Sequence, residues 1–391
     1  MPSVLFHVQY LLGIGHLQRS LRIAEALADA GLAVTLVQGG PPLPEITCGG
    51  GIDIVQLPAI RSRDASFALV DAAGELVTDA LREQRRTALL CAFNTARPDA
   101  VVIEGFPFAR RAFRFELDPL IAAARGAGAK IICSVRDIPT VRADPERLAA
   151  IVARVRGDFD AVLVHGDPGF IPFDAAFPAA PEIADRLHYT GYVATVSLST
   201  PGGGEGRGEA GDSGSAGAFP RHPPSAKLRA PSPPNGRRGN EDDDILISVG
   251  GGGAAGRALM QAAIEARRRG CLPTKTWRIL TGTALSDADL AEIRAAAPPG
   301  LIVERFRRDF ASLLRACHVS VSQAGYNTVL DILAAKARAV LVPFAAERET
   351  EQLIRAEHLA ARGAAVLLRE RELDAASLAA AIERAASSEP A

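Results

Sequence analysis

The sequence predicts an α/β protein built of two Rossmann-like domains, each formed around a parallel sheet. Its 391 residues suit two domains of ordinary size. In both halves, short apolar runs alternate with helical patterns. Between the halves, residues 199–244 are rich in Gly, Pro, Ser and charge, and such a segment cannot offset its ordering entropy. We therefore expect an N-terminal domain over 1–198, a disordered linker over 199–244 and a C-terminal domain over 245–391.

The apolar runs of the first half are unbroken rather than alternating, which is typical of strands covered on both faces. They predict strands at 4–9, 33–38, 52–57, 99–104, 130–135, 160–165 and 187–192. A helix is expected over 16–30, because its apolar residues fall on one face: Leu17, Leu21, Ala24, Leu27 and Ala28.

The same alternation restarts after the linker. It predicts strands at 244–250, 276–280, 301–304, 318–322, 339–344 and 364–368. Helices lie between them, and the last helix spans about 374–386. Ligands of such folds bind beyond the carboxyl ends of the strands, so we expect the site in a cleft where the two sheets face each other.

Composition and charge exclude several classes of protein. The formal net charge is −1, so nothing global favours nucleic acid as a partner. No stretch reaches the ~18 apolar residues of a membrane span, and the first residues lack the features of a signal peptide. The five cysteines are scattered, without a CxxC pair or a histidine at metal-ligand spacing. This pattern predicts reduced thiols, a cytoplasmic protein and no metal site.

The stretch "GIGHLQRS" begins where the first strand is expected to end. Gly13 and Gly15 allow a tight turn and close approach of a ligand, and the N–H groups at a helix start favour negative charge. The positive end of the helix also disfavours an imidazolium, which keeps His16 neutral and able to accept a proton. The alternative is that His16 only caps or packs the turn.

A second glycine loop, "SVGGGGAAGR", follows the first strand of the second half. Backbone N–H groups of its glycines would form a cradle for a diphosphate at the start of the next helix. These glycines are Gly250, Gly251, Gly252 and Gly253. No Lys-Ser/Thr pair follows, so this is not a Walker A loop, and the pattern does not fit a nicotinamide dinucleotide site. A structural turn is the alternative.

Polar residues recur at the strand ends of the first half, which by topology point toward the cleft. We expect them at this cleft: Glu104, Arg136, Asp137 and His165. Each alone could equally be a solvated loop residue. The stretch "FPFARRAFRFEL" adds arginines among phenylalanines, typical either of a surface for anions or headgroups or of a helix with a buried apolar face.

The stretch "SQAGYNTVLDIL" is the most informative of the second half. A strand is expected to end near Ser322, and a glycine turn leads into a helix from about Asn327. Asp331 lies one turn inside that helix, where its carboxylate can accept both hydroxyls of a ribose. The alternative is a carboxylate that only interacts favourably with the positive end of the helix.

Together, "GIGHLQRSLRIAEALADAG", "SVGGGGAAG", "SQAGYNTVLDILAAKARAVLVPF" and "ERETEQLIRAEHL" resemble family 28 glycosyltransferases. The chain is most similar to a bacterial branch of predicted glycosyltransferases, related to the N-acetylglucosaminyltransferase that forms lipid II. The resemblance covers nearly the whole chain except the linker. It implies a GT-B fold and an inverting transfer of a hexose from a nucleotide diphosphate sugar, UDP-linked by expectation, usually without a required metal and with no other cofactor. It also implies that the donor binds mainly to the C-terminal domain and the acceptor to the N-terminal one, whose candidate residues are Gly13, Gly15, Glu104, Arg136, Asp137 and His165.

The resemblance also assigns roles residue by residue. His16 matches a histidine that is a candidate base for the acceptor hydroxyl, and Gly250 to Gly253 match the loop against the donor phosphates. Asp331 stands where relatives bind the ribose, beside Gly325, Asn327 and Thr328. The remaining matches are Phe306 and Arg307 for the base of the nucleotide, and Glu351 and Gln352 for hydroxyls of the donor sugar.

Three departures from the pattern bear on the substrate. Asp331 replaces a glutamate, Glu351 replaces a glutamine of a pair that is offset by one residue, and the glycines before His16 are not adjacent. This last arrangement, Gly13-Ile14-Gly15-His16, also resembles a UDP-sugar hydrolase of the same fold. A hydrolase, an epimerase and a non-catalytic nucleotide-sugar-binding protein are therefore the alternatives. The acceptor expected for a transferase is lipid-linked or a small glycan, and peripheral contact with the inner face of a membrane is compatible with the sequence.

Overall fold

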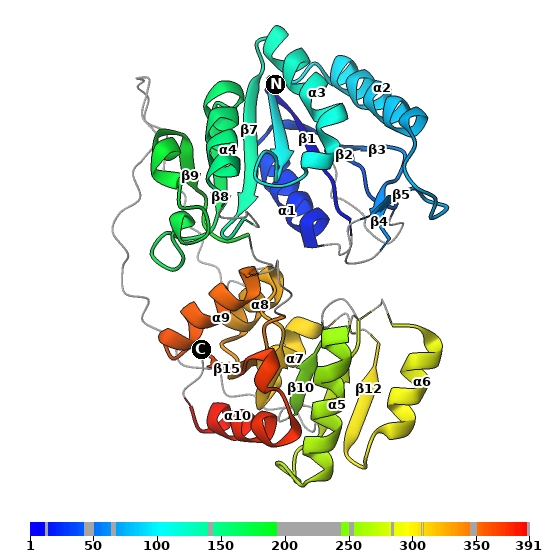
Figure 1. Cartoon of the computed structure of the whole chain (residues 1–391), viewed down its shortest axis with the longest axis vertical. Coiled ribbons are helices and arrows are strands. Elements are labelled where there is room, and N and C mark those ends of the chain that lie inside the picture. The colour runs from blue at the N-terminus through cyan, green and yellow to red at the C-terminus, as the bar shows by residue number, and fades with distance from the viewer. Residues whose placement is uncertain are drawn as a thin grey trace, which may run out of the picture.

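The computed structural model describes residues 1–11, 15–42, 51–63, 68–139, 144–193, 244–249, 254–282, 285–305, 307, 309–344 and 350–388. Most of the predicted linker lies outside these residues, together with the boundary predicted after residue 198. Figure 1 shows two α/β units, one formed by the chain up to residue 193 and the other by the chain from residue 244.

The first unit contains a parallel sheet, which has seven strands among the described residues. Its strands are β1 (Ser3–Val8), β2 (Ala33–Gln38), β3 (Ile52–Gln56), β6 (Ala100–Glu104), β7 (Lys130–Arg136), β8 (Ala161–His165) and β9 (Leu187–Tyr189). Their order is β3-β2-β1-β6-β7-β8-β9. A short antiparallel pair, β4 (Arg61–Ser62) and β5 (Leu69–Val70), stands apart from this sheet.

Helices cover both faces of the first sheet. Val4 and Phe6 share an apolar cluster with Leu17 of α1 (Gly15–Asp29), whereas Leu5 belongs to the cluster of the opposite face. This alternation along β1 is the period of a strand. The opposite face is covered by α2 (Asp79–Ala96), α3 (Arg114–Gly126) and α4 (Pro145–Asp158), with three short 3₁₀ turns at Arg111–Phe113, Phe173–Ala175 and Ala180–Arg186.

A fully buried ion pair joins α2 to α3. Arg85 donates to both carboxylate oxygens of Glu116, at 2.8 and 2.7 Å, and neither side chain is exposed. Arg85 also donates to Oε1 of Gln9, just beyond β1, and to the carbonyl of Gly39, just beyond β2. Burial of these charges is tolerated because each one is paired and hydrogen-bonded.

The second unit repeats the architecture with β10 (Ile245–Ser248), β11 (Trp277–Leu280), β12 (Leu301–Glu304), β13 (Val319–Ser322), β14 (Ala339–Leu341) and β15 (Val366–Leu367). The strands are parallel in the order β12-β11-β10-β13-β14-β15. Ile245 and Ile247 of β10 face one apolar cluster and Leu246 faces the other. Both faces of this sheet are therefore buried as well.

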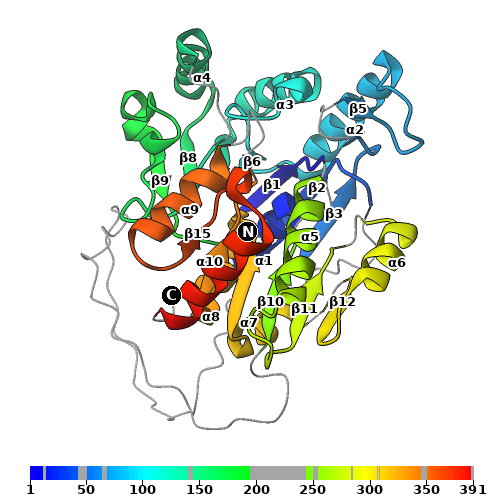
Figure 2. The same ribbon diagram turned by 60° about the horizontal axis from the view of Figure 1, so that its bottom comes forward.

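The helices of the second unit divide between these two clusters. One face packs against α5 (Ala254–Arg268), α6 (Asp287–Ala296) and α10 (Ala375–Ser387), and the other against α7 (Phe310–Ala316), α8 (Tyr326–Ala335) and α9 (Glu351–Ala361). A 3₁₀ turn at Glu370–Glu372 precedes α10. Figure 2 shows α10 beside α5, on the same side of the sheet.

The predicted fold class, two Rossmann-like units with parallel sheets, is confirmed. In each sheet the first strand lies between the second strand and a later one. The order in which strands are added therefore changes from one side of β1, and of β10, to the other. Four predicted strands are markedly shorter in the structure. Those predicted at 187–192 and 364–368 are the edge strands Leu187–Tyr189 and Val366–Leu367, and those predicted at 244–250 and 339–344 are the interior strands Ile245–Ser248 and Ala339–Leu341.

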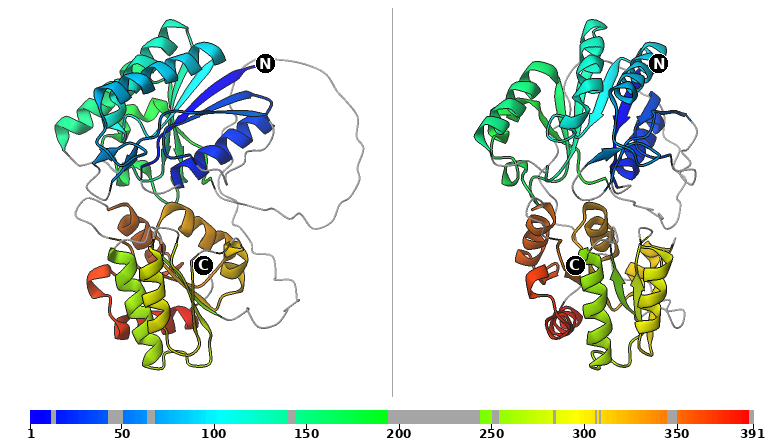
Figure 3. Two further views of the ribbon diagram at one scale, coloured as in Figure 1. Left: turned by 90° about the vertical axis from the view of Figure 1, so that its right-hand side faces the viewer. Right: turned by 45° about the vertical axis from the view of Figure 1, so that its right-hand side comes forward.

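The carboxyl ends of the two sheets meet where the units contact each other (Figure 3). Tyr326, the first residue of α8, donates its hydroxyl proton to the carbonyl of His165, the last residue of β8, at 3.0 Å. The same hydroxyl accepts from the backbone N–H of Val193. Arg362, the residue that caps the C-terminus of α9, donates to the carbonyl of Phe170 in the first unit. Residues from both units therefore border the predicted site.

Candidate active site at the junction of the two sheets

The start of α1 brings His16 to the carboxyl end of the first sheet. β6, the strand beside β1, ends at Glu104. Because β1 and β6 are parallel neighbours, the segments that follow them leave the sheet at the same edge. Nδ1 of His16 lies 2.6 Å from Oε1 of Glu104. Two residues that were selected separately from the sequence are thus hydrogen-bonded to each other.

The charges of this pair define which nitrogen of His16 carries the proton. Burial lowers the pKa of His16 to about 4, although Glu104 acts to raise it. Burial would raise the pKa of Glu104, but His16, Arg110 and Arg19 hold it well below its usual range. At neutral pH, Glu104 is an anion and can only accept, so the proton of neutral His16 lies on Nδ1. Nε2 then carries the lone pair, and no described residue forms a hydrogen bond with it.

Arg19 donates to the same oxygen of Glu104 that His16 contacts, and it was not selected from the sequence. Its Nη2 donates to Oε1 of Glu104 at 2.6 Å, and its side chain is only 3% exposed. The guanidinium also lies over the ring of Tyr326, 5.4 Å from its centre. A usable signal was present, because Arg19 is three residues after His16 and such residues share a helix face.

The starts of α1 and α8 abut at the junction. A Cβ atom on Gly15 would lie 3.1 Å from Nδ2 of Asn327, so a side chain at Gly15 would push against the second residue of α8. The N-cap of α8 is Gly325, which has no side chain to accept a hydrogen bond from the backbone N–H groups of the first turn. Oδ1 of Asn327 is buried and no described residue donates to it. Thr328 and Asp331 lie half-buried in the same helix. The first turn of α8 therefore retains donors for a ligand.

Three other predicted residues form ion pairs at the contact between the units, together with Arg355, which was not selected from the sequence. Arg355 of α9 donates to Oδ1 of Asp137 at 2.9 Å, and both side chains are almost completely buried. Arg355 also donates to Glu351, and Oε2 of Glu351 lies 2.5 Å from Arg136 at the end of β7. Asp137, Arg136 and Glu351 thus hold the two sheets together at the edge of the site.

Two further residues are engaged in local hydrogen bonds. Nε2 of His165 lies 2.7 Å from the hydroxyl of Ser134, and its Nδ1 lies 2.8 Å from that of Thr190. Burial lowers the pKa of His165 to about 3. Gln352 accepts from the backbone N–H of Phe344. Both ring nitrogens of His165 are therefore hydrogen-bonded within the first unit, where the bond to Ser134 joins β8 to β7. Its contact with the second unit is made by its backbone carbonyl.

Several predicted residues lie outside the described part of the chain, namely Gly13, Gly250, Gly251, Gly252, Gly253 and Phe306. Arg307 is described, and its guanidinium donates to both carboxylate oxygens of Asp309 just after β12. Within the described residues, no three His, Cys, Asp or Glu side chains are grouped to hold a metal ion. A separate search of those residues gave no helix that is both long and apolar enough to cross a membrane.

Sequence comparisons identify a family match in the second unit and partial curated relatives of the chain. Residues 246–391 match the family described as "Glycosyltransferase family 28 C-terminal domain". A UDP-N-acetylglucosamine--N-acetylmuramyl-(pentapeptide) pyrophosphoryl-undecaprenol N-acetylglucosamine transferase from Desulforudis audaxviator is 33% identical over 88 residues, or 22% of this chain and 24% of that protein. Its counterpart from Anaeromyxobacter sp. is 35% identical over 80 residues, 20% and 21% of the two chains. The chain thus spans less than a quarter of the length of these two curated relatives.

Solved structures resemble the whole chain. The glycotransferase of kitacinnamycin superimposes with a TM-score of 0.60 at 16% identity, covering 99% of this chain and 91% of that one. MurG from Acinetobacter baumannii superimposes with a TM-score of 0.54 at 16% identity, covering 100% and 96%. At such identities the likeness shows the fold alone. The whole chain therefore has the GT-B fold, and its residues 246–391 belong to the C-terminal domain family of the family 28 glycosyltransferases.

Proposed function

We propose that the protein is an inverting glycosyltransferase. It moves a sugar from a UDP-linked nucleotide diphosphate sugar to an acceptor hydroxyl. The observation that carries the proposal is the hydrogen bond between His16 and Glu104. It leaves the lone pair of Nε2 directed away from Glu104, on a ring that is 27% exposed and lines a cavity. A neutral imidazole with an oriented free nitrogen is suited to general base catalysis.

In the proposed reaction, Nε2 of His16 removes the proton of the acceptor hydroxyl. The acceptor oxygen forms a bond to the anomeric carbon while the bond from that carbon to the phosphate oxygen breaks. The nucleoside diphosphate leaves from the opposite face, so one displacement inverts the anomeric centre. Glu104 then faces an imidazolium, which its negative charge stabilises.

The donor is assigned to the second unit. The starts of α5 and α8 offer backbone N–H groups to phosphate oxygens, and Asp331 provides a carboxylate in the second turn of α8. Gly325, Asn327 and Thr328 border the same turn. The loop from Gly250 to Gly253, Phe306, Arg307 and Gln352 complete the donor assignment as predictions from the sequence. No step in this scheme requires a metal or another cofactor.

The ion pairs between the units support a joint site. Asp137 and Arg355 bring α9 of the donor unit to the end of β7, on the acceptor side. The proposed acceptor is lipid-linked or a small glycan, and the proposed location is the cytoplasm, with peripheral contact at the inner face of the membrane. Gly13, Gly15, Arg136 and His165 stay assigned to the acceptor side as predictions.

The test begins with a thermal-shift screen of nucleotide diphosphate sugars, which identifies the donor. His16→Ala is then expected to abolish turnover while it largely spares donor binding. Wild-type turnover by this variant would contradict the base assignment. Rapid release of free sugar, or formation of an epimer, without any acceptor would assign the site to a hydrolase or an epimerase. Donor binding without turnover on any acceptor would indicate a binding protein.

A further inference from the structure

Arg19 is a buried cation that contacts both units. It belongs to α1 of the first unit, and its side chain is 3% exposed. Its Nη2 donates to Oε1 of Glu104 at 2.6 Å, whereas its buried Nε forms no hydrogen bond with any described residue. Its guanidinium lies 5.4 Å from the centre of the Tyr326 ring in the second unit. The position of Arg19 therefore depends on an anion in one unit and on an aromatic ring in the other.

Tyr326 is fixed by contacts with both units as well. Its side chain is buried, its main chain begins α8, and its hydroxyl donates to the carbonyl of His165 in the first unit at 3.0 Å. The guanidinium of Arg355, from α9, lies 5.6 Å from the centre of the same ring. Two arginines, one from each unit, thus pack against this ring. The contacts of Tyr326 with Arg19 and His165 exist only while the two units touch each other.

The helix that begins with Tyr326 is also the helix assigned to the donor. Asn327 follows Tyr326 in the first turn, and Asp331 lies in the second turn. The start of this helix is packed closely against α1, because a Cβ atom on Gly15 would lie 3.1 Å from Nδ2 of Asn327. A displacement of the start of α8 therefore moves the ring against which Arg19 packs.

The two carboxylate oxygens of Glu104 face different cations. Oε1 accepts from Arg19 and from Nδ1 of His16, both at 2.6 Å. Oε2 is buried without a hydrogen bond from any described residue, and Nη2 of Arg110 lies 3.5 Å from it. If Arg19 were removed, the cation left beside the carboxylate would be Arg110, at the oxygen that does not contact His16. The carboxylate would then be attracted away from Nδ1.

We propose that Arg19 and Tyr326 are positioning residues for the catalytic base. Tyr326 holds Arg19 against Glu104, and Arg19 holds Oε1 of Glu104 at Nδ1 of His16. Nε2 of His16 then keeps its lone pair for the proton of the acceptor. The base is correctly oriented only while α8 is packed against α1. This inference rests on the proposed function, since it concerns the orientation of the base in the same reaction.

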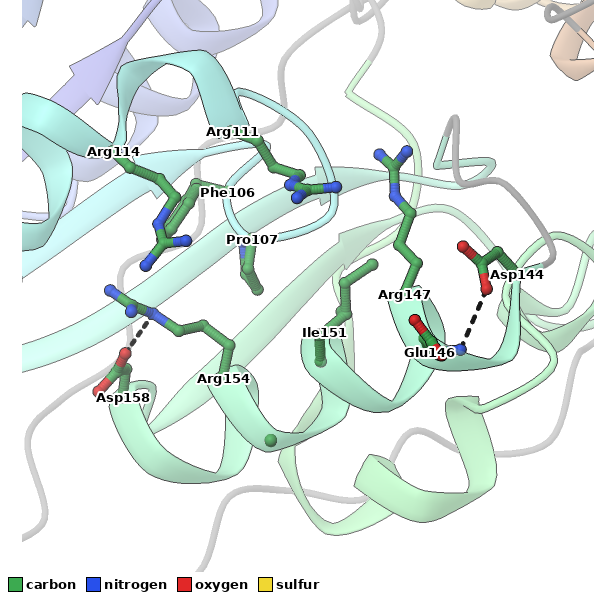
Figure 4. A pocket seen from close by; sticks show the side chains of 12 residues that line it. Phe106, Pro107, Arg111, Arg114, Asp144, Glu146, Arg147, Ile151, Arg154 and Asp158 are labelled. Carbon is green, nitrogen blue, oxygen red and sulfur yellow. Dashed lines mark hydrogen bonds and ion pairs between the residues drawn. The ribbon is translucent and has the colours of Figure 1, made fainter.

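Another arginine of the first unit makes the same kinds of contact away from the base. Figure 4 shows Arg154 beside Phe106 and Asp158, in the wall of a cavity of about 640 Å³. Its guanidinium lies 5.4 Å from the centre of the Phe106 ring and forms ion pairs with Asp118 and Asp158. All of these residues belong to the first unit, so the contacts do not depend on the second. Arg154→Met is therefore the matched control.

The first test is heteronuclear NMR of the His16 ring nitrogens in the full chain, assigned by the loss of their signals in His16→Gln. In the wild type at neutral pH, Nδ1 is expected to carry the proton and Nε2 to be unprotonated. Arg19→Met and Tyr326→Leu are each expected to give a mixture of the two tautomers, although Tyr326 lies in the other unit. Arg19→Lys should restore part of the Nδ1–H form. Tyr326→Phe, which keeps the ring, and Arg154→Met should match the wild type.

The second test compares turnover with donor binding. Arg19→Met and Tyr326→Leu are each expected to lower kcat about tenfold or more, while the KM for the donor changes less than threefold. Arg19→Lys should recover part of the lost turnover. The double variant Arg19→Met/Tyr326→Leu should be no slower than Arg19→Met alone, because Tyr326 acts through Arg19.

The inference is overturned if Arg19→Met and Tyr326→Leu both keep the wild-type tautomer and a kcat within threefold of the wild type. A wild-type tautomer in Tyr326→Leu alone, or equal losses in Tyr326→Leu and Tyr326→Phe, would overturn the role of the ring. If Arg19→Met fails to fold, the comparison of these two Tyr326 variants decides. Wild-type turnover by His16→Ala would instead contradict the proposed function, and the NMR measurement distinguishes the two failures because it requires no turnover.

Discussion

Replacing Glu104 with glutamine tests the proposed chemistry directly. Glu104→Gln keeps the size of the side chain and an oxygen that can accept from Nδ1 of His16, but it removes the negative charge. The neutral ring in the resting enzyme should therefore stay oriented. The imidazolium that forms when Nε2 takes the acceptor proton loses its counter-charge and still faces Arg19 and Arg110. Turnover should fall much more than donor binding.

The magnitude follows from the distance. With Nδ1 and Oε1 2.6 Å apart, the centres of the two charges lie about 4 Å apart, and their interaction is about 4 kcal/mol at an effective dielectric constant of about 20. The hydrogen bond that the amide retains offsets about 1 kcal/mol. A loss of about 3 kcal/mol in the transition state lowers kcat roughly 100-fold.

The assay is steady-state release of nucleoside diphosphate, with the donor found by the thermal-shift screen and an acceptor that supports turnover. NMR titration of His16 supplies a second readout, since its pKa should fall further below 4 when Glu104 no longer raises it. Glu83→Gln is the control, because Glu83 lies on α2 with a half-exposed side chain. A Glu104→Gln enzyme with kcat within threefold of the wild type would refute the role of this pair.

Three further predictions concern stability. Arg355→Met leaves Asp137 buried without its partner, so the free energy of unfolding in urea should fall by about 3–5 kcal/mol, and a fall below 1 kcal/mol would contradict the importance of this ion pair. Arg85→Met should cost a similar amount through Glu116, and adding Glu116→Gln should restore part of the loss if the stranded charge is the cause. His165 binds its proton with a pKa of about 3 in the folded state, below its ordinary value, so the unfolded state holds more protons between about pH 3 and 6.5. Its contribution to stability is complete above that window and falls by about 1.4 kcal/mol per pH unit on acidification, and His165→Gln should make urea unfolding less dependent on pH there.

The fold could be predicted because its signals are local. Unbroken apolar runs such as 99–104 and 130–135 identify strands buried on both faces, and their alternation with helices leaves few topologies. The errors are in strand length, both at the sheet edges, at 187–192 and 364–368, and in the interior, at 244–250 and 339–344. Hydrophobic pattern alone does not reveal where the pairing between backbones ends.

The sequence selects candidate site residues one at a time, but it does not reveal which of them contact each other. His16 and Glu104 were both selected, yet they are 88 residues apart, and only the order of β1 and β6 in the sheet brings them together. Asp137 and Arg355 are separated by 218 residues and lie in different units. Arg19 was missed because an arginine on a helix is usually solvated, and only the structure shows that it is buried against Glu104.

The buried contact between Asp137 and Arg355 has a consequence for how this chain can be recombined with its relatives. A chimaera that joins the first unit of this protein to the second unit of another must inherit an arginine at the position of Arg355. Otherwise the carboxylate of Asp137 is buried between the two units without a positive charge to pair with it. The two units can therefore be exchanged only when both carry this ion pair. A designer of hybrid enzymes should select the two source proteins by the presence of this pair before comparing their overall sequence identity.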